Sequence, residues 1–562
     1  MMPFNKGIFN WRNTVIGAAL LFLFTFVLLP LLLLIWKSFF DPEGDLSLRN
    51  YLAVYSKSGN WDAIVTTVVV CGLTMLFSMI FATVLAWLVV RSDLPFKNQF
   101  RSLFFMPYII PPYVGAIAWI LLLTPGVGYI NQILMNLFGL EAPGPFDIYT
   151  TAGLVWVMTL FYYPLAFLNV ASALEQMDNS LEEAARISGA GPLRVFRDVT
   201  LPLVSPSFFA GGLLVFSASA SAFGIPAMIG MPSRIYVLST QVMTYVYMGT
   251  SSGMREATAL SVVLMVLAVI TMTLGNRLLS KRKYTLVGGK SARVLSVSLG
   301  RMRPVAVGFA LLMGFLLVIL PIGSIVLTSF VNIFGEPIST DNLTLNHYKY
   351  ILSFNMALEA FRNSFLMGAA AATLALFLAS LIAYYRVKAK SKLAKISDLI
   401  ATIPYATPGT VIALALIIAF SGKYGLNLYN TFIILIIAYM IKYLAFSVRT
   451  ICASLEQIDL SLEEAAQISG ASWFQSFKDI ILPLVRPGLI AAWFLVFMTA
   501  FYELTMTILL YGPRTHNLGV VLYELQTYSN QQAASVLAVL ILIVVIGGNL
   551  LVAGITKGRI AI

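Results

Sequence analysis

Two copies of one polar passage hold the residues of this chain that are best suited to binding chemistry. The first, LEQMDNSLEEAARISGAGPLRVFRDVTLPLVSP, begins at Leu174, and the second, LEQIDLSLEEAAQISGASWFQSFKDIILPLVRP, begins at Leu455. The separation of these two starting points, the repeat offset, is half the length of the 562-residue chain. A repeat at half the chain length indicates two similar units joined head to tail. Because the most similar stretch is polar, with paired carboxylates in each copy, we expect it to carry the function.

Each copy reads as a helix, a glycine and a second helix. Asp178 or Ser180 can cap the first helix, whose first turn holds two glutamates, and carboxylates favour the positive end of the helix dipole. A glycine can end it in a left-handed conformation. We expect a second short helix over about 192–199. The residues of this pattern are Glu182, Glu183, Ala184, Ala185, Gly189, Leu201 and Pro202, and then Glu463, Glu464, Ala465, Ala466, Gly470, Leu482 and Pro483.

The elements around these passages are membrane spans. The chain is 59% hydrophobic and 11% charged, with a mean hydropathy of +0.87, far more apolar than a soluble domain. Apolar stretches long enough to cross a bilayer recur along it. The sequence therefore predicts an all-α polytopic membrane protein of two parallel six-helix repeats. The expected spans are 14–36, 64–90, 102–123, 150–172, 207–230, 257–276, 304–330, 363–385, 398–420, 431–452, 488–511 and 533–555.

Basic residues predict the orientation. The segment 277–303 has eight basic residues and no acidic one, and short loops rich in Lys and Arg stay in the cytoplasm. This predicts cytoplasmic termini, a cytoplasmic linker and two cytoplasmic repeated passages. A nucleic-acid site is a possible interpretation of the linker, but contact with anionic lipid explains its charge more simply. The predicted organisation is a first repeat at 1–276 with a loop at 173–206, the linker at 277–303, and a second repeat at 304–562 with a loop at 454–487.

The repeated passages diverge less than their surroundings. An amphipathic loop lying on the membrane is the simplest interpretation. However, most positions are identical between the two copies of the passage, whereas the first spans of the halves share little beyond hydrophobicity. A partner that docks in both halves would explain this difference.

The passages resemble the cytoplasmic signature of permease subunits in binding-protein-dependent ABC importers. The signature is E-A-A, three residues, G, nine residues, a β-branched residue, one more residue and L-P, and the chain has Val199 where isoleucine is usual. The resemblance spans essentially the whole chain and implies a fused permease with the type I importer fold, in the bacterial cytoplasmic (inner) membrane. It also implies that each signature is a coupling helix seated on an ATP-hydrolysing subunit, so we expect two ATPase copies and an extracytoplasmic substrate-binding protein as partners.

This chain is not expected to hydrolyse ATP itself. The nearest approach to a phosphate-binding loop is Gly289-Lys290-Ser291, but the required preceding glycine is replaced by Tyr284. We expect the chain to be a transport subunit without a bound cofactor, with ATP and Mg held by the partner subunits. A loaded binding protein is expected to dock on outer loops that include 37–62 and 331–362.

Prolines and polar residues within spans suggest the path. Pro107-Tyr108-Ile-Ile-Pro111 and Pro404-Tyr405-Ala-Thr-Pro408 interrupt the third span of each half, and interrupted helices at corresponding positions point to a pathway or to a structural kink. The fifth span follows each repeated passage and offers further polar groups. The pathway candidates are Ser217, Ser219, Ser221, Tyr502, Glu503, Lys442, Pro107, Pro111, Pro404 and Pro408.

Glu503 and Lys442 are unexpected charges within spans. Intramembrane charges are costly and usually face a cavity or a counter-charge. They are expected either to pair as a structural lock or, for Glu503, to face the path as a transient contact for a cation. The second interpretation is favoured because the equivalent residues of the first half are Ala222 and Phe161. No metal site is assigned.

Two other transporter classes share features with this sequence. Twelve spans in two halves also fit a secondary transporter, but such a carrier needs no duplicated docking passages. A channel would need rings of similar residues. Within the importers, Ala222–Gly230 (AFGIPAMIG) and Tyr502–Arg514 (YELTMTILLYGPR) most resemble ferric-iron permeases, with relatives for aminoethylphosphonate or thiamine as alternatives.

Overall fold

The computed structural model describes residues 11–41, 43–177, 179–280, 297–528 and 530–555. The predicted all-helical fold is confirmed, because the described residues hold helices and only isolated β-bridges. The predicted cap Asp178, the triplet at 289–291 and the centre of the basic linker lie outside the described residues.

The helices fall into two series that follow the same order, except that α7 has no counterpart among the described helices of the second half. In the first half they are α1 (Trp11–Leu23), α2 (Leu29–Ser38), α3 (Arg49–Ser56), α4 (Ser58–Arg91), α5 (Lys97–Phe105), α6 (Pro112–Leu123), α7 (Tyr129–Phe138), α8 (Thr151–Gln176), α9 (Asn179–Ile187), α10 (Pro192–Val195), α11 (Leu201–Ala220), α12 (Leu238–Tyr247) and α13 (Ser251–Ser280). In the second half they are α14 (Arg303–Gly314), α15 (Leu320–Phe330), α16 (Asn346–Ser353), α17 (Asn355–Val387), α18 (Lys392–Ala406), α19 (Gly409–Phe420), α20 (Phe432–Glu456), α21 (Leu460–Ile468), α22 (Trp473–Ser476), α23 (Leu482–Phe501), α24 (Thr507–Leu510), α25 (Leu518–Thr527) and α26 (Gln531–Ile555).

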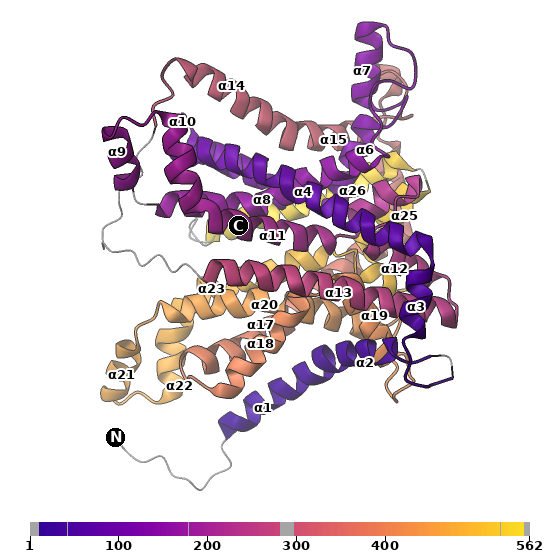
Figure 1. Ribbon diagram of the computed structural model, residues 1–562. Coiled ribbons are helices and arrows are strands. Elements are labelled where there is room, and N and C mark those ends of the chain that lie inside the picture. The colour runs from indigo at the N-terminus through magenta and orange to yellow at the C-terminus, as the bar shows by residue number, and fades with distance from the viewer. Residues whose placement is uncertain (1–10, 42, 178, 281–296, 529, 556–562) are drawn as a thin grey trace.

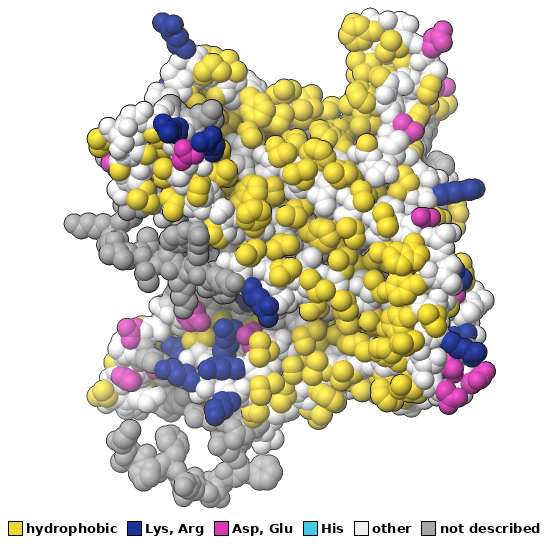
Figure 2. Space-filling model, viewed as in Figure 1, with side chains coloured by type: hydrophobic (Ala, Val, Ile, Leu, Met, Phe, Trp, Pro, Cys, Tyr) yellow, Lys and Arg dark blue, Asp and Glu magenta, His cyan; other side chains and the backbone are white. Residues whose placement is uncertain are grey.

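The number of membrane spans agrees with the prediction. Within the described ranges, ten helices are long and apolar enough to cross a membrane, and two bent helix pairs raise the number to as many as 12. Figure 2 shows hydrophobic side chains over the middle of the visible face, with charged side chains gathered toward its two ends. This distribution suits a protein whose middle faces lipid.

Each half is built on three packed helices. In the first half α4, α8 and α11 contact one another, and α17, α20 and α23 do the same in the second. Matching caps begin the central helices: the Thr150 hydroxyl accepts a hydrogen bond from the Gly153 N–H, and Thr431 accepts one from Ile434. The two threonines are separated by the repeat offset, so the repeat seen in the passages extends to the way their helices start.

The first span of each half packs on the other half. Helix α1 contacts α18 and α2 contacts α19, whereas α14 contacts α5 and α15 contacts α6. A hydrogen bond also joins the two halves here, between the hydroxyls of Tyr129 in the first half and Thr328 in the second, at 2.8 Å. The halves are therefore interlocked.

The third span of each half is broken at its two prolines. The bend between the α5 side and α6 is 95°, and that between α18 and α19 is 112°. In the first half a single 3₁₀ turn, η2 (Met106–Tyr108), lies beside the bend. The predicted interruption of both spans is thus confirmed.

The predicted fifth spans need correction. They were expected at 207–230 and 488–511, but the helical spans are Phe196–Ala220 and Phe474–Phe501. The chain after each span turns back within the bundle, where η4 (Pro226–Gly230) and α24 form short helical segments. At the first turn a Cβ on Gly224 would lie 2.8 Å from the Tyr113 Cβ, so the close approach of the backbone requires glycine.

The predicted second helix at 192–199 also needs correction. It is not a separate element, because α10 continues through the π-helical turn η3 (Phe196–Thr200) into α11. The second half repeats this arrangement with α22, η9 (Phe477–Ile481) and α23. Each repeated passage is therefore one small helix attached to the extension of a membrane span.

Candidate coupling and pathway sites

Helices α9 and α21 project from the same end of the molecule, on different halves (Figure 1). Each ends at a glycine with positive φ, +85° at Gly189 and +87° at Gly470. The N–H of Ala190 bonds the Ala185 carbonyl at 3.0 Å, which closes a Schellman turn, and the second half has the same bond. The predicted glycine stop is confirmed in both halves.

The first glutamate of each pair is an anchor. An oxygen of Glu182 lies 2.7 Å from the Arg91 guanidinium at the end of α4, and Thr200 donates a hydrogen bond of 2.6 Å to the same carboxylate. Both side chains of the ion pair are buried, with 7% and 1% exposure. Helix α9 is thereby bound to α4 and to η3.

The second half has an equivalent anchor with a different cation. Glu463 lies 2.7 Å from Lys388, just after α17, and Lys388 also donates a hydrogen bond of 3.0 Å to the Ile458 carbonyl. The Glu463 side chain is 13% exposed. Neither Arg91 nor Lys388 was identified from the sequence, although each is a basic residue at the end of a second span.

The second glutamate of each pair points away from these anchors. Glu183 and Glu464 are exposed, as are Ala184, Ala465, Gly189, Gly470, Pro202 and Pro483. Ile187 is 88% exposed and Ile468 is 87% exposed, at equivalent positions. Exposed apolar side chains beside a free carboxylate are typical of a docking surface. Ala185 and Ala466 are half-buried, and Leu201 and Leu482 are partly exposed at the starts of α11 and α23.

Glu503 caps a short helix. Its side chain is buried and accepts hydrogen bonds from the N–H of Met506 and from the N–H and hydroxyl of Thr507, all between 2.9 and 3.1 Å. These groups lie at the start of α24, where N–H groups need acceptors. The equivalent of Thr507 in the first half is Pro226, which has no N–H. This explains why the carboxylate occurs in one half only.

Lys442 binds carbonyl groups at the break between α18 and α19. Its Nζ donates to the carbonyls of Pro404 at 3.1 Å and Thr407 at 2.7 Å. In an unbroken helix the Pro404 carbonyl would accept from residue 408, but that residue is a proline without an N–H. In the part of the chain that the structure describes, Glu503 and Lys442 form no salt bridge, because each side chain binds backbone groups beside a break. The two predicted roles, mutual pairing or exposure of Glu503 to the path, stay predictions.

Most of the remaining pathway candidates make contacts within their own helices or lie at the bends. Ser219 and Ser221 donate hydrogen bonds to carbonyls of their own helix, at Phe216 and Ser217. Pro107 and Pro404 are buried at the bends, and Pro111 and Pro408 precede α6 and α19. Tyr502 is partly exposed. A path role for these residues stays a prediction.

The two halves are closed against each other on the side away from α9 and α21. The Tyr113 hydroxyl donates to the Tyr502 carbonyl at 3.0 Å, and the Tyr247 hydroxyl donates to the Ile508 carbonyl at 2.7 Å. Both bonds join a first-half side chain to the segment that turns back in the second half. Breaking these contacts would be necessary to open the junction from that side.

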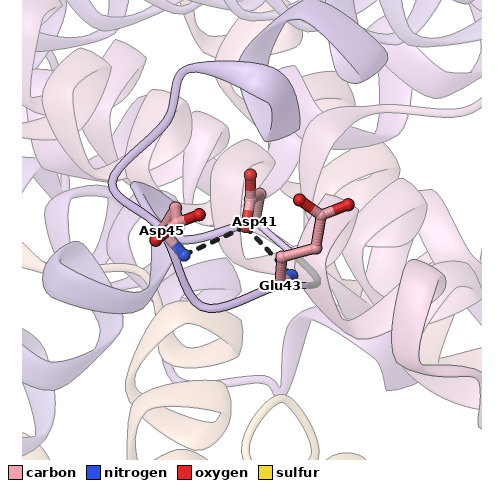
Figure 3. Close-up of side chains that lie close together, drawn as sticks. All are labelled: Asp41, Glu43 and Asp45. Carbon is pink, nitrogen blue, oxygen red and sulfur yellow. Dashed lines mark hydrogen bonds between the residues drawn. The ribbon is translucent and has the colours of Figure 1, made fainter.

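An acidic cluster lies in the predicted outer loop 37–62 (Figure 3). Asp41, Glu43 and Asp45 are close enough to share a metal ion. However, one Asp41 oxygen accepts three backbone N–H groups, from Glu43, Gly44 and Asp45, and Arg49 lies 3.9 Å from the other. These contacts explain the cluster as a turn closed by the Asp41 carboxylate, with the Arg49 guanidinium as its counter-charge.

Comparison with known proteins gives matches in both halves. The family model described as the binding-protein-dependent transport system inner membrane component matches residues 78–283 and 372–557. The chain is 27% identical over 456 residues to the Fe(3+)-transport system permease protein FbpB 2 of Haemophilus influenzae, covering 80% of each chain. It is 26% identical to the ferric transport system permease protein FbpB of Actinobacillus pleuropneumoniae, covering 85% of this chain and 69% of that one. The molybdenum transport system permease protein ModB of Escherichia coli K12 is 32% identical over 38% of this chain and 90% of its own length.

Proposed function

The chain belongs to the family of binding-protein-dependent transport system inner membrane components, and we propose that it is the permease of an importer that carries ferric iron. It is a multi-pass inner-membrane transport subunit with one family domain in each half. The ferric assignment is supported by ferric permeases of two organisms that align with most of the chain, across both halves. The molybdenum permease, in contrast, aligns with 38% of it.

The observation that carries the coupling proposal is the pair of anchored helices with exposed glutamates. Glu182 and Glu463 hold α9 and α21 to the spans, which leaves Glu183 and Glu464 free for a partner. Two similar surfaces on the same end suit two copies of one ATPase subunit, and we assign ATP and Mg to those subunits. Under this proposal α9, α21 and both termini are cytoplasmic.

The transport step follows from how these helices are attached. Because α10 continues into α11, and α22 into α23, movement of a docked ATPase would pass directly into a membrane span. The structure has α9 and α21 apart and the opposite side closed by the Tyr113 and Tyr247 bonds. ATP-driven approach of the two ATPase copies would open that side to an external binding protein, which we place on α3 and α16 in the outer loops 37–62 and 331–362.

Charge reversal tests the coupling surface. The double variant Glu183→Lys/Glu464→Lys should lose copurification of the ATPase and lose uptake, while its helix content stays unchanged. Glu141→Lys, an exposed substitution in the 124–149 loop, is the matched control and should copurify the ATPase normally. Normal copurification and uptake in the double variant would refute the coupling assignment.

The cargo is tested separately with the reconstituted complex. Its ATPase activity should rise when the cognate binding protein is loaded with ferric iron, and molybdate should give no rise. Stimulation by molybdate, thiamine or aminoethylphosphonate in place of ferric iron would refute the ferric assignment while leaving the coupling proposal intact.

A further inference from the structure

Five tyrosines from both halves gather where the broken spans bend. Tyr108 ends η2 at the first bend, and Tyr405 is the second-last residue of α18 at the other. The remaining three come from α8, α20 and the residue that follows α23. The members of this tyrosine cluster are Tyr108, Tyr162, Tyr405, Tyr443 and Tyr502.

The cluster lies near the middle of the membrane-spanning region. Tyr162 and Tyr443 are each eleven residues from the start of their helices, α8 and α20. At 1.5 Å per residue this is about 17 Å, roughly half of the 30 Å hydrocarbon core. A solute that crosses between the halves must pass this depth.

Four of the five tyrosines follow the symmetry of the chain, whereas the equivalent of Tyr502 is Ser221. Tyr162 and Tyr443 are separated by the repeat offset, and Tyr108 and Tyr405 are the second residues of the two Pro-Tyr-x-x-Pro motifs. A structural phenol in one half need not be repeated in the other: the equivalent of the buried Tyr163 is Leu444. Duplicated phenols at the bends therefore point to a role shared by both halves.

Tyr108 connects the halves within the cluster. Its side chain lies near those of Tyr162, Tyr405, Tyr443 and Tyr502, three of which belong to the second half. Tyr405 and Tyr443 also contact one ring, Phe446, with centroids 5.2 and 6.2 Å away. The five side chains thus form one group and not scattered contacts.

The phenols are accessible. Tyr108 is 37% exposed and Tyr405 is 38% exposed, and the other three are partly exposed. The Tyr502 carbonyl, in contrast, accepts the hydrogen bond from Tyr113 that helps to close the opposite side. The cluster therefore lies next to the closed part of the junction.

We propose that the tyrosine cluster is a way-point for a cation in the transport path. Phenol oxygens are neutral acceptors suited to a hard metal ion, and aromatic faces attract positive charge. Neutral ligands bind weakly enough to release the solute again. The inference rests on the proposed importer function and gives the charge of its cargo.

Two substitutions distinguish the oxygen from the ring. Phenylalanine at Tyr108 and Tyr443 removes the hydroxyls and keeps the aromatic faces, whereas leucine removes both. The variants are measured in the complete complex with its ATPase and binding protein, in proteoliposomes supplied with radioactive ferric iron or with thiamine. ATPase stimulation by the loaded binding protein reports that folding and coupling are intact. Tyr236→Phe is the matched control, because it removes the hydroxyl of a partly exposed tyrosine outside the cluster.

For ferric cargo, Tyr108→Phe/Tyr443→Phe should lower uptake by about tenfold or more, since it removes two oxygen contacts. ATPase stimulation and the Tyr236→Phe uptake should stay near wild type. If the wild type carries thiamine and not iron, the ferric assignment is wrong. The cluster proposal is then still supported when the double leucine variant loses thiamine uptake and the double phenylalanine variant keeps it. The cluster proposal is overturned if both double variants transport the wild-type cation normally, or if the cargo is an anion such as molybdate.

Discussion

Removing Arg91 should release α9 from the membrane spans while leaving the spans folded. Helix α9 has nine residues, and isolated helices of that length are marginal in water. Among its described side chains, Glu182 is the one that is buried. The Arg91 to Glu182 ion pair is therefore the main attachment of the helix.

The magnitude follows from the burial of the pair. Breaking a buried ion pair by removing one partner costs about 3–5 kcal/mol. Glu182 keeps its hydrogen bond from Thr200 and has Arg186 at 3.8 Å. The cost of Arg91→Met should therefore lie near the lower end of this range. About 3 kcal/mol corresponds to more than a hundredfold shift toward detached α9. Lys388→Met should cost less in the second half, because water reaches Glu463 more easily.

Hydrogen exchange of the α9 and α21 amides measures this difference in the purified complex. Protection should fall strongly in α9 for Arg91→Met and more weakly in α21 for Lys388→Met. Arg101→Met is the control, since its ion pair with Glu175 is exposed on both sides and such pairs contribute about 1 kcal/mol or less. Arg91→Met/Glu182→Met should recover part of the protection, because an apolar pair leaves no buried charge unpaired. Unchanged α9 exchange in Arg91→Met would refute the anchor.

Two other predictions concern caps. Glu503→Ala should destabilise the purified protein by about 1–3 kcal/mol, seen as a lower Tm, because it leaves buried N–H groups at the start of α24 without acceptors; an unchanged Tm would contradict the capping role. Hydrogen bonds from the Ser461 N–H and hydroxyl to Asp459 hold the pKa of that carboxyl below its ordinary 3.8. Its support for α21 is thus complete above pH 3.8 and is lost as the pH falls through the lowered value. Asp459→Asn should remove this acid-dependent loss of α21 protection in hydrogen exchange, and persistence of the loss would locate it elsewhere.

Periodic features of the fold could be predicted because they depend on local chemistry. The spans follow from hydropathy, and the stops at Gly189 and Gly470 follow from the need for a positive φ. The end of the fifth span could not be placed this way, because residues 221–230 are as apolar as a span. Where their backbone turns, Gly224 packs closely against Tyr113, a contact between distant residues that no local pattern reveals.

The candidate site could likewise be predicted where it depends on a local repeated pattern, and not where it depends on contacts between distant residues. The duplicated glutamates were found because they repeat at a fixed offset, but the division of labour between Glu182 and Glu183 depends on where Arg91 lies in space. A search for basic residues at equivalent span ends would have suggested Arg91 and Lys388. The repeat offset likewise relates Tyr162 to Tyr443, although nothing in the sequence brings them next to Tyr108.

The asymmetric charges and the symmetric phenols lead to opposite conclusions about function. Glu503 and Lys442 occur in one half, and each supplies a partner for backbone groups that a nearby proline or helix end leaves free. Their asymmetry follows from local backbone chemistry, such as Thr507 in place of Pro226, and needs no substrate to explain it. The phenols at the bends occur in both halves, and two of them have more than a third of their surface exposed. A solute that crosses between two similar halves meets both, so the duplicated, accessible phenols are the stronger indication of the path.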